Sequence, residues 1–145
     1  MTTIVFRDGV LAADSRAYSG DKVPIGSKTK IVRMKDGSLL GVSTTSVGGD
    51  ALIRRWVESG CKPVSGDAAK PSSFSALMIR PNGEVFYACD NMEWTGPLTG
   101  PFFAIGSGDQ FALGALAMGA TATQAVEAAI SLDPWSAGPI NTLEG

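Results

Sequence analysis

Histidine is absent from the sequence, and cysteine is scarce. Ser-His-Asp and Cys-His nucleophilic catalysis need an imidazole base, and the HExxH metallopeptidases need two histidine ligands, so these enzyme classes are excluded. The two cysteines, Cys61 and Cys89, form no CxxC pair. Because zinc sites are built mostly from histidine and clustered cysteine, we expect no metal site. Two cysteines also provide no disulfide framework, which favours a reducing, cytoplasmic location.

Charge is low, and neither sign dominates. Charged residues make up 18% of the chain, and the formal net charge is −2. The sequence contains no like-charge run and no basic patch, so a nucleic-acid partner is not expected. A charged fraction below the usual quarter favours extra buried surface, such as an oligomer interface.

No segment of the sequence has the pattern of a membrane span or a signal peptide. The most apolar stretch, residues 111–130, is interrupted by Gln124 and Glu127 and is rich in alanine and glycine, which is typical of packed helices. The first residues, Met-Thr-Thr-Ile-Val, lack a basic region followed by a long apolar run. We therefore expect no membrane partner.

A chain of 145 residues is enough for one domain, spanning residues 1–145, but not for two. Three pairs of β-branched, apolar segments flank short glycine-containing turns at Asp8-Gly9, residues 35–37 and residues 81–83. Turns of this kind join antiparallel strands, so three hairpins are predicted. The predicted strands are residues 2–7, 10–15, 30–34, 38–43, 74–80 and 84–89.

Three segments have the spacing or composition of helices, which together with the hairpins predicts an α+β fold. Residues 48–60 place apolar side chains at helical spacing, and residues 108–119 are rich in small residues. A third helix is predicted to begin at Thr121, which fits a capping box with Gln124, and to end before Pro134. Loops are predicted at residues 61–73 and 90–101, and short strands at 102–105 and 137–143.

Without histidine, a hydroxyl nucleophile needs a carboxylate, a lysine of lowered pKa or an α-amine as its base. The pKa of an α-amine is normally about 8, which suits proton transfer near neutral pH. A threonine at the amino terminus carries a nucleophile and such a base on one residue. Bacterial processing removes Met before a small residue, so we expect Met1 to be lost and Thr2 to become the first residue. On position alone, an ordinary first strand residue is the simpler interpretation of Thr2.

Other motifs occur in the order found in one enzyme family. Asp14 lies within the segment GVLAADSRA, and Lys30 lies within SKTKIV. Ser107 lies within AIGSG before a predicted helix, and Asp133 and Ser136 lie within DPWSAG. Each motif alone has little specificity, but together with the amino-terminal threonine their order is specific. The sequence resembles the proteasome β-subunit and HslV family of N-terminal nucleophile hydrolases over residues 2–60 and 74–143.

The resemblance implies a four-layer αββα sandwich, in which two antiparallel sheets lie between helical layers. It also implies a role for each matched residue. Thr2 would be the nucleophile, and Lys30 beside it would lower the pKa of the hydroxyl or accept its proton. Asp14 would orient Lys30. The Thr2 α-amine would be held through hydrogen bonds by Ser107, Asp133 and Ser136.

Each of these residues also has a purely structural interpretation. Asp14 fits a turn at the end of a strand, and Lys30 fits a solvated strand position. Ser107 fits an ordinary loop, while Asp133 and Ser136 fit the end of a helix and the turn after it. The residues alone leave both interpretations open.

Two features depart from the family pattern. In the family, the loop after the fourth strand carries a glycine whose amide stabilises the oxyanion, and the residue that aligns with it is Thr45. A backbone N–H survives a change of side chain, so Thr45 is the predicted oxyanion donor. In addition, residues 61–73 replace the second long helix of the family. This compactness is typical of a minimal bacterial or phage-encoded member.

The resemblance implies a threonine-type peptidase that cleaves unfolded polypeptide inside a homo-oligomeric ring, through an acyl-enzyme ester on Thr2. It implies no metal or organic cofactor, and it is compatible with an ATP-dependent unfoldase as partner. Two alternatives stay open: a catalytically silent structural or assembly protein, for example of a phage, and an amidase that acts on a small molecule. The loop at Thr45 and the missing helix favour the structural protein, whereas the retained site residues oppose it.

Overall fold

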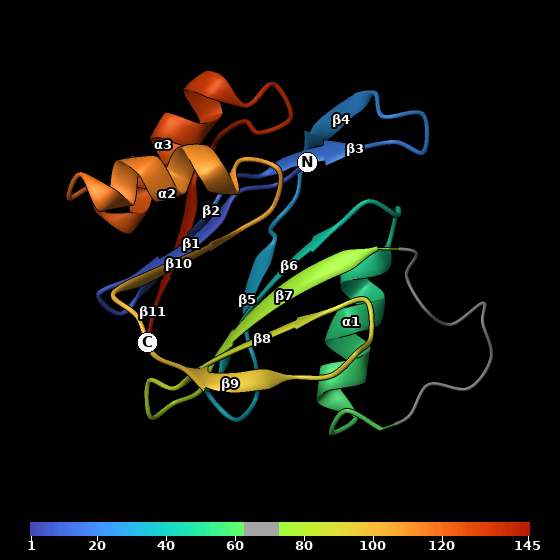
Figure 1. Ribbon diagram of the computed structural model, residues 1–145. Helices are drawn as coiled ribbons and strands as arrows, with labels where there is room; N and C mark the ends of the chain where they lie inside the picture. The colour runs from blue at the N-terminus through green and yellow to red at the C-terminus, as the bar shows by residue number, and fades with distance from the viewer. Residues whose placement is uncertain (63–72) are drawn as a thin grey trace.

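The computed structural model describes residues 1–62 and 73–145, which fold into antiparallel sheets covered by helices (Figure 1). The α+β class expected from the sequence is confirmed. The helices are α1 (Gly49–Glu58), α2 (Asp109–Ala117) and α3 (Ala122–Leu132). The strands are β1 (Ile4–Arg7), β2 (Val10–Ala13), β3 (Arg16–Tyr18), β4 (Pro24–Ser27), β5 (Ile31–Arg33), β6 (Leu39–Thr44), β7 (Phe74–Ile79), β8 (Val85–Cys89), β9 (Thr95–Leu98), β10 (Phe102–Ile105) and β11 (Asn141–Glu144).

The first sheet has the strand order β10-β1-β2-β11, and every pair in it is antiparallel. The two-residue turn Asp8-Gly9 joins β1 to β2, with positive φ angles of 50° and 79°. This turn geometry matches the right-handed twist of the paired strands. On its other side β1 pairs with β10, so residues 4–7 lie against residues 102–105. The beginning of the chain is thereby held inside a sheet.

The second sheet has five antiparallel strands in the order β5-β6-β7-β8-β9. The hairpins β5–β6 and β7–β8 turn at the two remaining glycine-containing segments, residues 35–37 and 81–83. All three predicted hairpins are therefore confirmed. β3 and β4 form a separate two-stranded sheet, in which Ile25 of β4 is exposed, as is Val23 just before β4.

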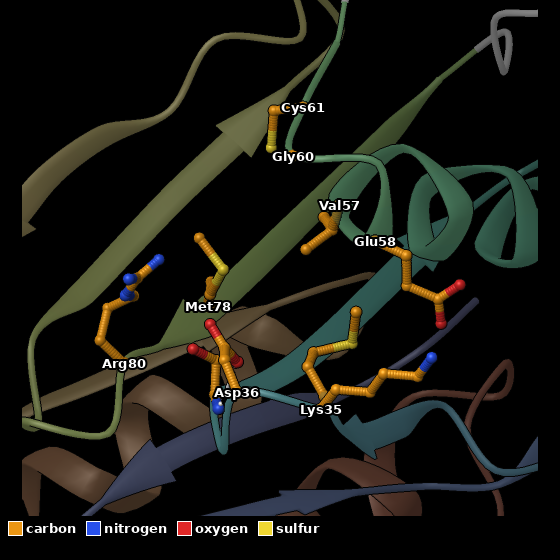
Figure 2. A pocket seen from close by; sticks show the side chains of 10 residues that line it. Lys35, Asp36, Val57, Glu58, Gly60, Cys61, Met78 and Arg80 are labelled. Carbon is orange, nitrogen blue, oxygen red and sulfur yellow. Dashed lines mark hydrogen bonds between the residues drawn. The ribbon is translucent and has the colours of Figure 1, made fainter.

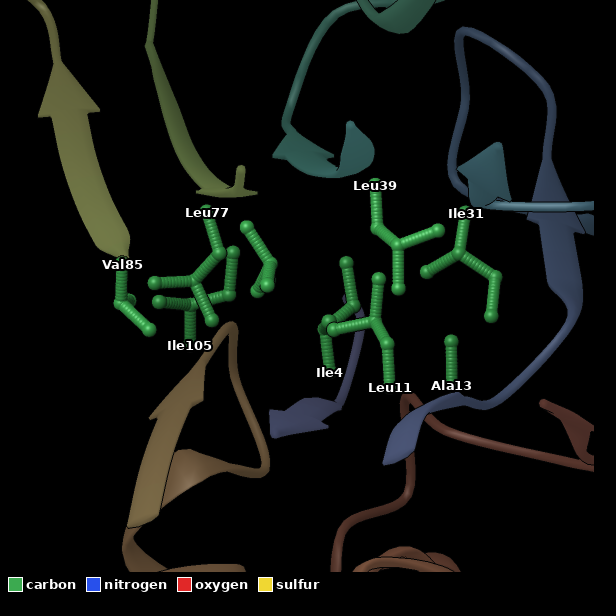
Figure 3. Close-up of a cluster of buried hydrophobic side chains, with 9 residues drawn as sticks. Ile4, Leu11, Ala13, Ile31, Leu39, Leu77, Val85 and Ile105 are labelled. Atoms are coloured by element: carbon green, nitrogen blue, oxygen red, sulfur yellow. The ribbon is translucent and has the colours of Figure 1, made fainter. Parts of the chain in front are cut away.

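Three clusters of buried apolar side chains determine how sheets and helices stack. One cluster joins the facing sides of the two sheets and includes Ile4, Leu11, Leu39 and Leu77 (Figure 3). A second joins the outer side of the first sheet to α2 and α3, and a third joins the outer side of the second sheet to α1 (Figure 1). Successive strand residues face opposite sides, so Ile4 belongs to the cluster between the sheets and Val5 to the one beneath the helices. No helix in the described part of the chain is long and apolar enough to cross a membrane.

One strand forms where the sequence predicts a loop. Within residues 90–101, Thr95–Leu98 forms β9 at the edge of the second sheet and pairs with β8. The sequence does not predict this strand, because it contains Gly96 and Pro97, and both residue types are depleted in strands. An edge strand tolerates them, since one side of its backbone needs no partner.

Other differences concern short strands. Residues 137–143 are predicted as a strand, but β11 starts only after Pro139, which has no N–H to donate to a sheet. The sequence predicts no strand at Arg16–Tyr18 or Pro24–Ser27, where β3 and β4 form. All four residues of β4 are exposed, so it lacks the apolar alternation that marks a half-buried strand. The predicted loop at residues 61–73 lies largely outside the described residues.

The cluster between the sheets makes a prediction for stability. Leu11 is fully buried there, so Leu11→Ala should lower the free energy of unfolding by about 2–5 kcal/mol, the usual cost of a cavity in a core. Lys35 is exposed in the β5–β6 turn, and the control Lys35→Ala should change the free energy of unfolding by less than about 0.5 kcal/mol. Urea unfolding followed by circular dichroism measures both values, and equal losses in the two variants would contradict this assignment of the core.

Candidate active site

The fold brings the residues predicted for the site together around Thr2, which lies just before β1 and is 4% exposed. The backbone N–H of Thr2 donates to Ser107 Oγ at 3.0 Å, and the Thr2 carbonyl accepts from the N–H of Gly108 at 3.2 Å. Because β1 pairs with β10, the residues that follow β10 reach the start of β1. The contact between Thr2 and Ser107 is therefore a consequence of sheet topology.

The two glycines on either side of Ser107 permit this close approach. Gly106 has a φ angle of 99°, and a Cβ atom at this position would overlap the carbonyl oxygen of Thr2. A Cβ atom on Gly108 would overlap Thr3 Oγ1. The Gly-Ser-Gly segment thus allows the backbone between β10 and α2 to pack directly on Thr2 and Thr3.

Lys30 and Asp14 form a buried ion pair next to the Thr2 hydroxyl. Lys30 Nζ lies 3.0 Å from Asp14 Oδ1 and 3.2 Å from Oδ2, and it donates to Thr2 Oγ1 at 3.2 Å. The same nitrogen donates to the Met1 carbonyl oxygen at 3.0 Å. Asp14 follows β2 and Lys30 precedes β5, so the ion pair connects the two main sheets.

Asp14 is held by more than its ion pair. The carboxylate also accepts hydrogen bonds from the backbone N–H groups of Thr3 at 2.9 Å, Ala137 at 3.1 Å and Arg16 at 3.4 Å. These donors fix the orientation of the carboxylate and compensate for its complete burial. Asp14 therefore orients Lys30 from a rigid position.

Two opposing effects act on the pKa of Lys30. Burial lowers the pKa of Lys30 below its ordinary value, while the Asp14 carboxylate acts in the opposite direction. A lysine of lowered pKa is neutral more often near physiological pH, and a neutral amine accepts a proton from a hydroxyl that it contacts. The only hydroxyl to which Lys30 Nζ is bonded within the described residues is that of Thr2.

Ser107, Asp133 and Ser136 form a second network on the backbone side of Thr2. Ser107 Oγ donates to Asp133 Oδ2 at 2.7 Å, and Ser136 Oγ donates to the same oxygen at 2.8 Å. Burial by itself would raise the pKa of Asp133, but the bonds from the two serines and from the Trp135 N–H outweigh it, and the pKa lies below its ordinary value. Asp133 is therefore a carboxylate near neutral pH, and Ser107 links it to the Thr2 nitrogen.

The sequence did not single out Thr3, although this residue contacts both networks. Thr3 is fully buried, its N–H donates to Asp14, and its hydroxyl lies 2.8 Å from Ser136 Oγ. The only signal in the sequence is its place beside Thr2 at the start of a strand, where successive side chains point to opposite sides.

Thr45, the predicted oxyanion donor, lies in the same cleft as Thr2. Its N–H donates to the carbonyl oxygen of Ser73 at 3.3 Å, which continues the pairing of β6 with β7 by one residue. In this arrangement the N–H is engaged by the neighbouring strand and is not directed at Thr2. The oxyanion role of Thr45 stays a prediction, and it requires this hydrogen bond to open.

The cleft at Thr2 is narrow, with a volume of about 30 Å³, and Met1 is among the residues that line it. Arg16 and Lys28 also line the cleft, together with residues 44–47 at the end of β6 and just after it. Arg16 and Lys28 are cations, so part of the cleft lining is basic. Met1 and Thr2 therefore share one small cleft.

A roomier cavity of about 380 Å³ lies elsewhere, beside the carboxyl end of α1 (Figure 2). Its lining includes Lys35 and Asp36 from the β5–β6 turn, Glu58 from α1 and Arg80 after β7. None of the predicted site residues lines this cavity, so cavity volume does not locate the site. The described residues also contain no group of three or more Cys, Asp or Glu side chains arranged to hold a metal ion.

The overall fold of the chain is similar to that of solved structures. HslV from Trypanosoma brucei matches the chain with a TM-score of 0.68 and 18% identity, over 99% of both chains. The chain has an HslV-like N-terminal nucleophile hydrolase fold. Thiobacillus denitrificans BPH matches with a TM-score of 0.67 and 21% identity, over 98% of this chain and 95% of that one. BPH in complex with epoxomicin matches with a TM-score of 0.64 and 20% identity, over 98% and 96%.

The HslV-like fold confirms the resemblance inferred from the motifs of the sequence. No protein-family model and no curated protein sequence matches the chain. The likeness to HslV and BPH therefore lies in the path of the backbone, while the roles of the side chains rest on the geometry around Thr2.

The low pKa of Asp133 predicts part of the acid sensitivity of the protein. A carboxyl group whose pKa is lowered by folding stabilises the folded state above its unfolded pKa, and this contribution is lost as the pH falls through the folded pKa. Between about pH 5 and pH 2, the melting temperature of Asp133→Asn should therefore fall less steeply than that of the wild type. The control is Asp21→Asn, at an exposed turn, which should keep the wild-type slope. A wild-type slope in Asp133→Asn would contradict the assignment.

Proposed function

We propose that this chain is a threonine-type peptidase in which Thr2, exposed by removal of Met1, attacks the carbonyl carbon of a peptide bond. The position of Thr2 carries this proposal: its Oγ1 lies 3.2 Å from the buried Lys30 Nζ, and its nitrogen lies 3.0 Å from Ser107 Oγ. The hydroxyl of Thr2 is thus a nucleophile in contact with a possible base, and removal of Met1 would give the same residue a second base, its free amine. The HslV-like fold supports the same class of reaction.

The proton transfers would be shared by Lys30 and the Thr2 α-amine. In the first step, Thr2 Oγ1 bonds to the carbonyl carbon while its proton passes to neutral Lys30 or to the α-amine. Collapse of the tetrahedral intermediate breaks the carbon–nitrogen bond, and the leaving amine takes that proton, so an ester remains on Thr2. Water then attacks the ester with help from the same base and releases a carboxylic acid. These steps need no metal and no organic cofactor.

Removal of Met1 would complete the site in two ways. While Met1 is attached, the Thr2 nitrogen is an amide and cannot act as a base. Met1 also lines the cleft, and its carbonyl oxygen accepts a hydrogen bond from Lys30 Nζ. Its removal would widen the cleft for substrate and leave a free amine beside Ser107.

We further propose that residues 1–145 form one domain with four αββα layers, which assembles into a homo-oligomeric ring. The order of the three hydrophobic clusters supports the layers. Exposed apolar side chains on the helices and on the β3–β4 hairpin support assembly, namely Val23, Ile25, Phe111, Met118 and Leu132. A closed chamber would admit unfolded polypeptide as substrate, with an ATP-dependent unfoldase as the partner that delivers it.

The second candidate is a catalytically silent structural protein, and the engaged N–H of Thr45 favours it. Loss of one oxyanion donor typically lowers kcat by about 10²–10³-fold. The ion pair between Lys30 and Asp14 opposes this candidate. Apolar residues of the same volume usually stabilise a fold at least as well as a buried ion pair, so a scaffold gains little from keeping a lysine next to a threonine hydroxyl.

Removal of the Lys30 amine should disable the enzyme. Lys30→Ala should lower kcat for peptide hydrolysis by about 10²–10⁴-fold, the usual loss for a positioned acid–base group. Lys30→Arg should not restore it, because guanidinium does not give up its proton. Thr2→Ala should abolish turnover. Intact-mass measurement should show the loss of Met1, and a peptide epoxyketone should add to the wild type and not to Thr2→Ala, because this reagent needs both the hydroxyl and the free amine.

Lys35→Ala, in the β5–β6 turn outside the site, is the matched control and should keep the wild-type kcat. Thermal melts establish that each variant is folded. Hydrolysis by Lys30→Ala within about threefold of the wild-type rate would contradict the mechanism. A wild-type protein that has lost Met1 and cleaves neither peptides nor small amides would favour the structural protein, whereas cleavage of small amides alone would identify an amidase.

Assembly is tested on the wild-type protein. A ring predicts a species well above the 15.0 kDa of one chain in native mass spectrometry and in sedimentation. Its physical basis is the exposed apolar surface on the helices, which is covered in a ring. A strict monomer at high protein concentration would rule out a proteolytic chamber.

A further inference from the structure

Pairing of the first two strands continues to the backbone of Thr3, but apolar packing does not explain its buried, hydrogen-bonded hydroxyl. Its N–H donates to Asp14 Oδ1 at 2.9 Å, and its carbonyl oxygen accepts from the Asp14 N–H at 3.1 Å. Its hydroxyl lies 2.8 Å from Ser136 Oγ, and the side chain is fully buried. The backbone of Thr3 is therefore tied to the Lys30–Asp14 side of the site, and its side chain is tied to the Asp133 side.

The direction of these hydrogen bonds follows from a count of protons. Ser136 and Ser107 have one hydroxyl proton each, and both give it to Asp133 Oδ2, at 2.8 Å and 2.7 Å. The carboxylate has no proton to return. Ser136 Oγ must therefore accept its remaining bond from the Thr3 hydroxyl, just as Ser107 Oγ accepts from the Thr2 nitrogen.

The result is a closed circuit of hydrogen bonds between two adjacent residues. It runs from the Thr3 hydroxyl through Ser136, Asp133 and Ser107 to the Thr2 nitrogen, and the peptide bond between Thr2 and Thr3 closes it. Neighbouring hydrogen bonds in such a chain polarise one another. The Thr3 hydroxyl thus influences how firmly Asp133 and Ser107 hold the Thr2 nitrogen.

We propose that Thr3 is a positioning residue, whose hydroxyl orients the Thr2 amino group through Ser136 and Asp133 and whose N–H orients Asp14. This role rests on the proposed peptidase function. A Cβ atom on Gly108 would overlap Thr3 Oγ1, so the Thr3 hydroxyl packs directly against the backbone at Gly108. Packing alone would be served equally well by valine, which has the same shape and a strong preference for strands.

Two substitutions separate the hydroxyl from the shape of the side chain. Thr3→Val keeps the branched shape and should lower kcat for peptide hydrolysis by about 10–10²-fold with KM unchanged. The Thr2 amino group, which would lose its orientation, takes part in the reaction and does not bind substrate. Thr3→Ser keeps the hydroxyl and should restore kcat to within about threefold of the wild type. Thr142→Val, at an exposed position of β11, is the matched control and should behave as the wild type. If the wild type is active and Thr3→Val has the same kcat, the proposal is overturned.

A second measurement needs no turnover and so distinguishes failure of this role from failure of the peptidase function. The bond from Ser136 helps to keep the pKa of Asp133 low, and the Thr3 hydroxyl orients Ser136. In a ¹³C NMR titration of the Asp133 carboxyl, Thr3→Val should therefore raise the pKa toward its ordinary value, and Thr3→Ser should not. An unchanged titration in Thr3→Val would overturn the proposal even if the wild type hydrolyses peptides. If the titration shifts in Thr3→Val but the wild type does not hydrolyse peptides, the result would support the circuit and refute the peptidase.

Discussion

The carboxylate of Asp14 is the charge on which the arrangement of the site depends. It is completely buried and accepts hydrogen bonds from four separate segments: the start of β1, the start of β3, the residue before β5 and the segment that leads to β11. A buried charge that loses a partner typically costs about 3–5 kcal/mol. Any arrangement of the four segments that breaks one of these contacts is therefore disfavoured, and the arrangement that keeps them places Lys30 against the Thr2 hydroxyl.

Local chemistry made the hairpins and the third helix predictable. Asp8-Gly9 forms its turn because both residues adopt positive φ, and Thr121 and Gln124 form both bonds of a capping box. These features depend on residues that are neighbours in the sequence, so no knowledge of the tertiary fold is needed. Edge strands such as Thr95–Leu98 were missed because their side chains are largely exposed and carry no alternating apolar pattern.

The site residues were recognised through motifs, but the sequence contains no sign of how they are connected. Thr3 was overlooked because its hydroxyl bonds to Ser136, which is brought near by the packing of α3 and the following turn on the first sheet. Thr45 aligns with an oxyanion donor, yet the ladder between β6 and β7 extends far enough to engage its N–H with Ser73. Both facts depend on contacts between distant segments, which a single sequence does not reveal.

The pairing of β1 with β10 brings together residues that are made at different times during synthesis. The serine that holds the Thr2 nitrogen follows Thr2 by 105 residues, and Asp133 and Ser136 follow later still. At roughly 5–20 residues per second, several seconds separate Thr2 from this serine, and sheets built from such distant partners are slow to form. For an enzyme of the proposed kind, the nascent chain carries a threonine without its supporting groups. In such an enzyme the nucleophile would be made well before the groups that support it, which would limit cleavage of neighbouring nascent chains.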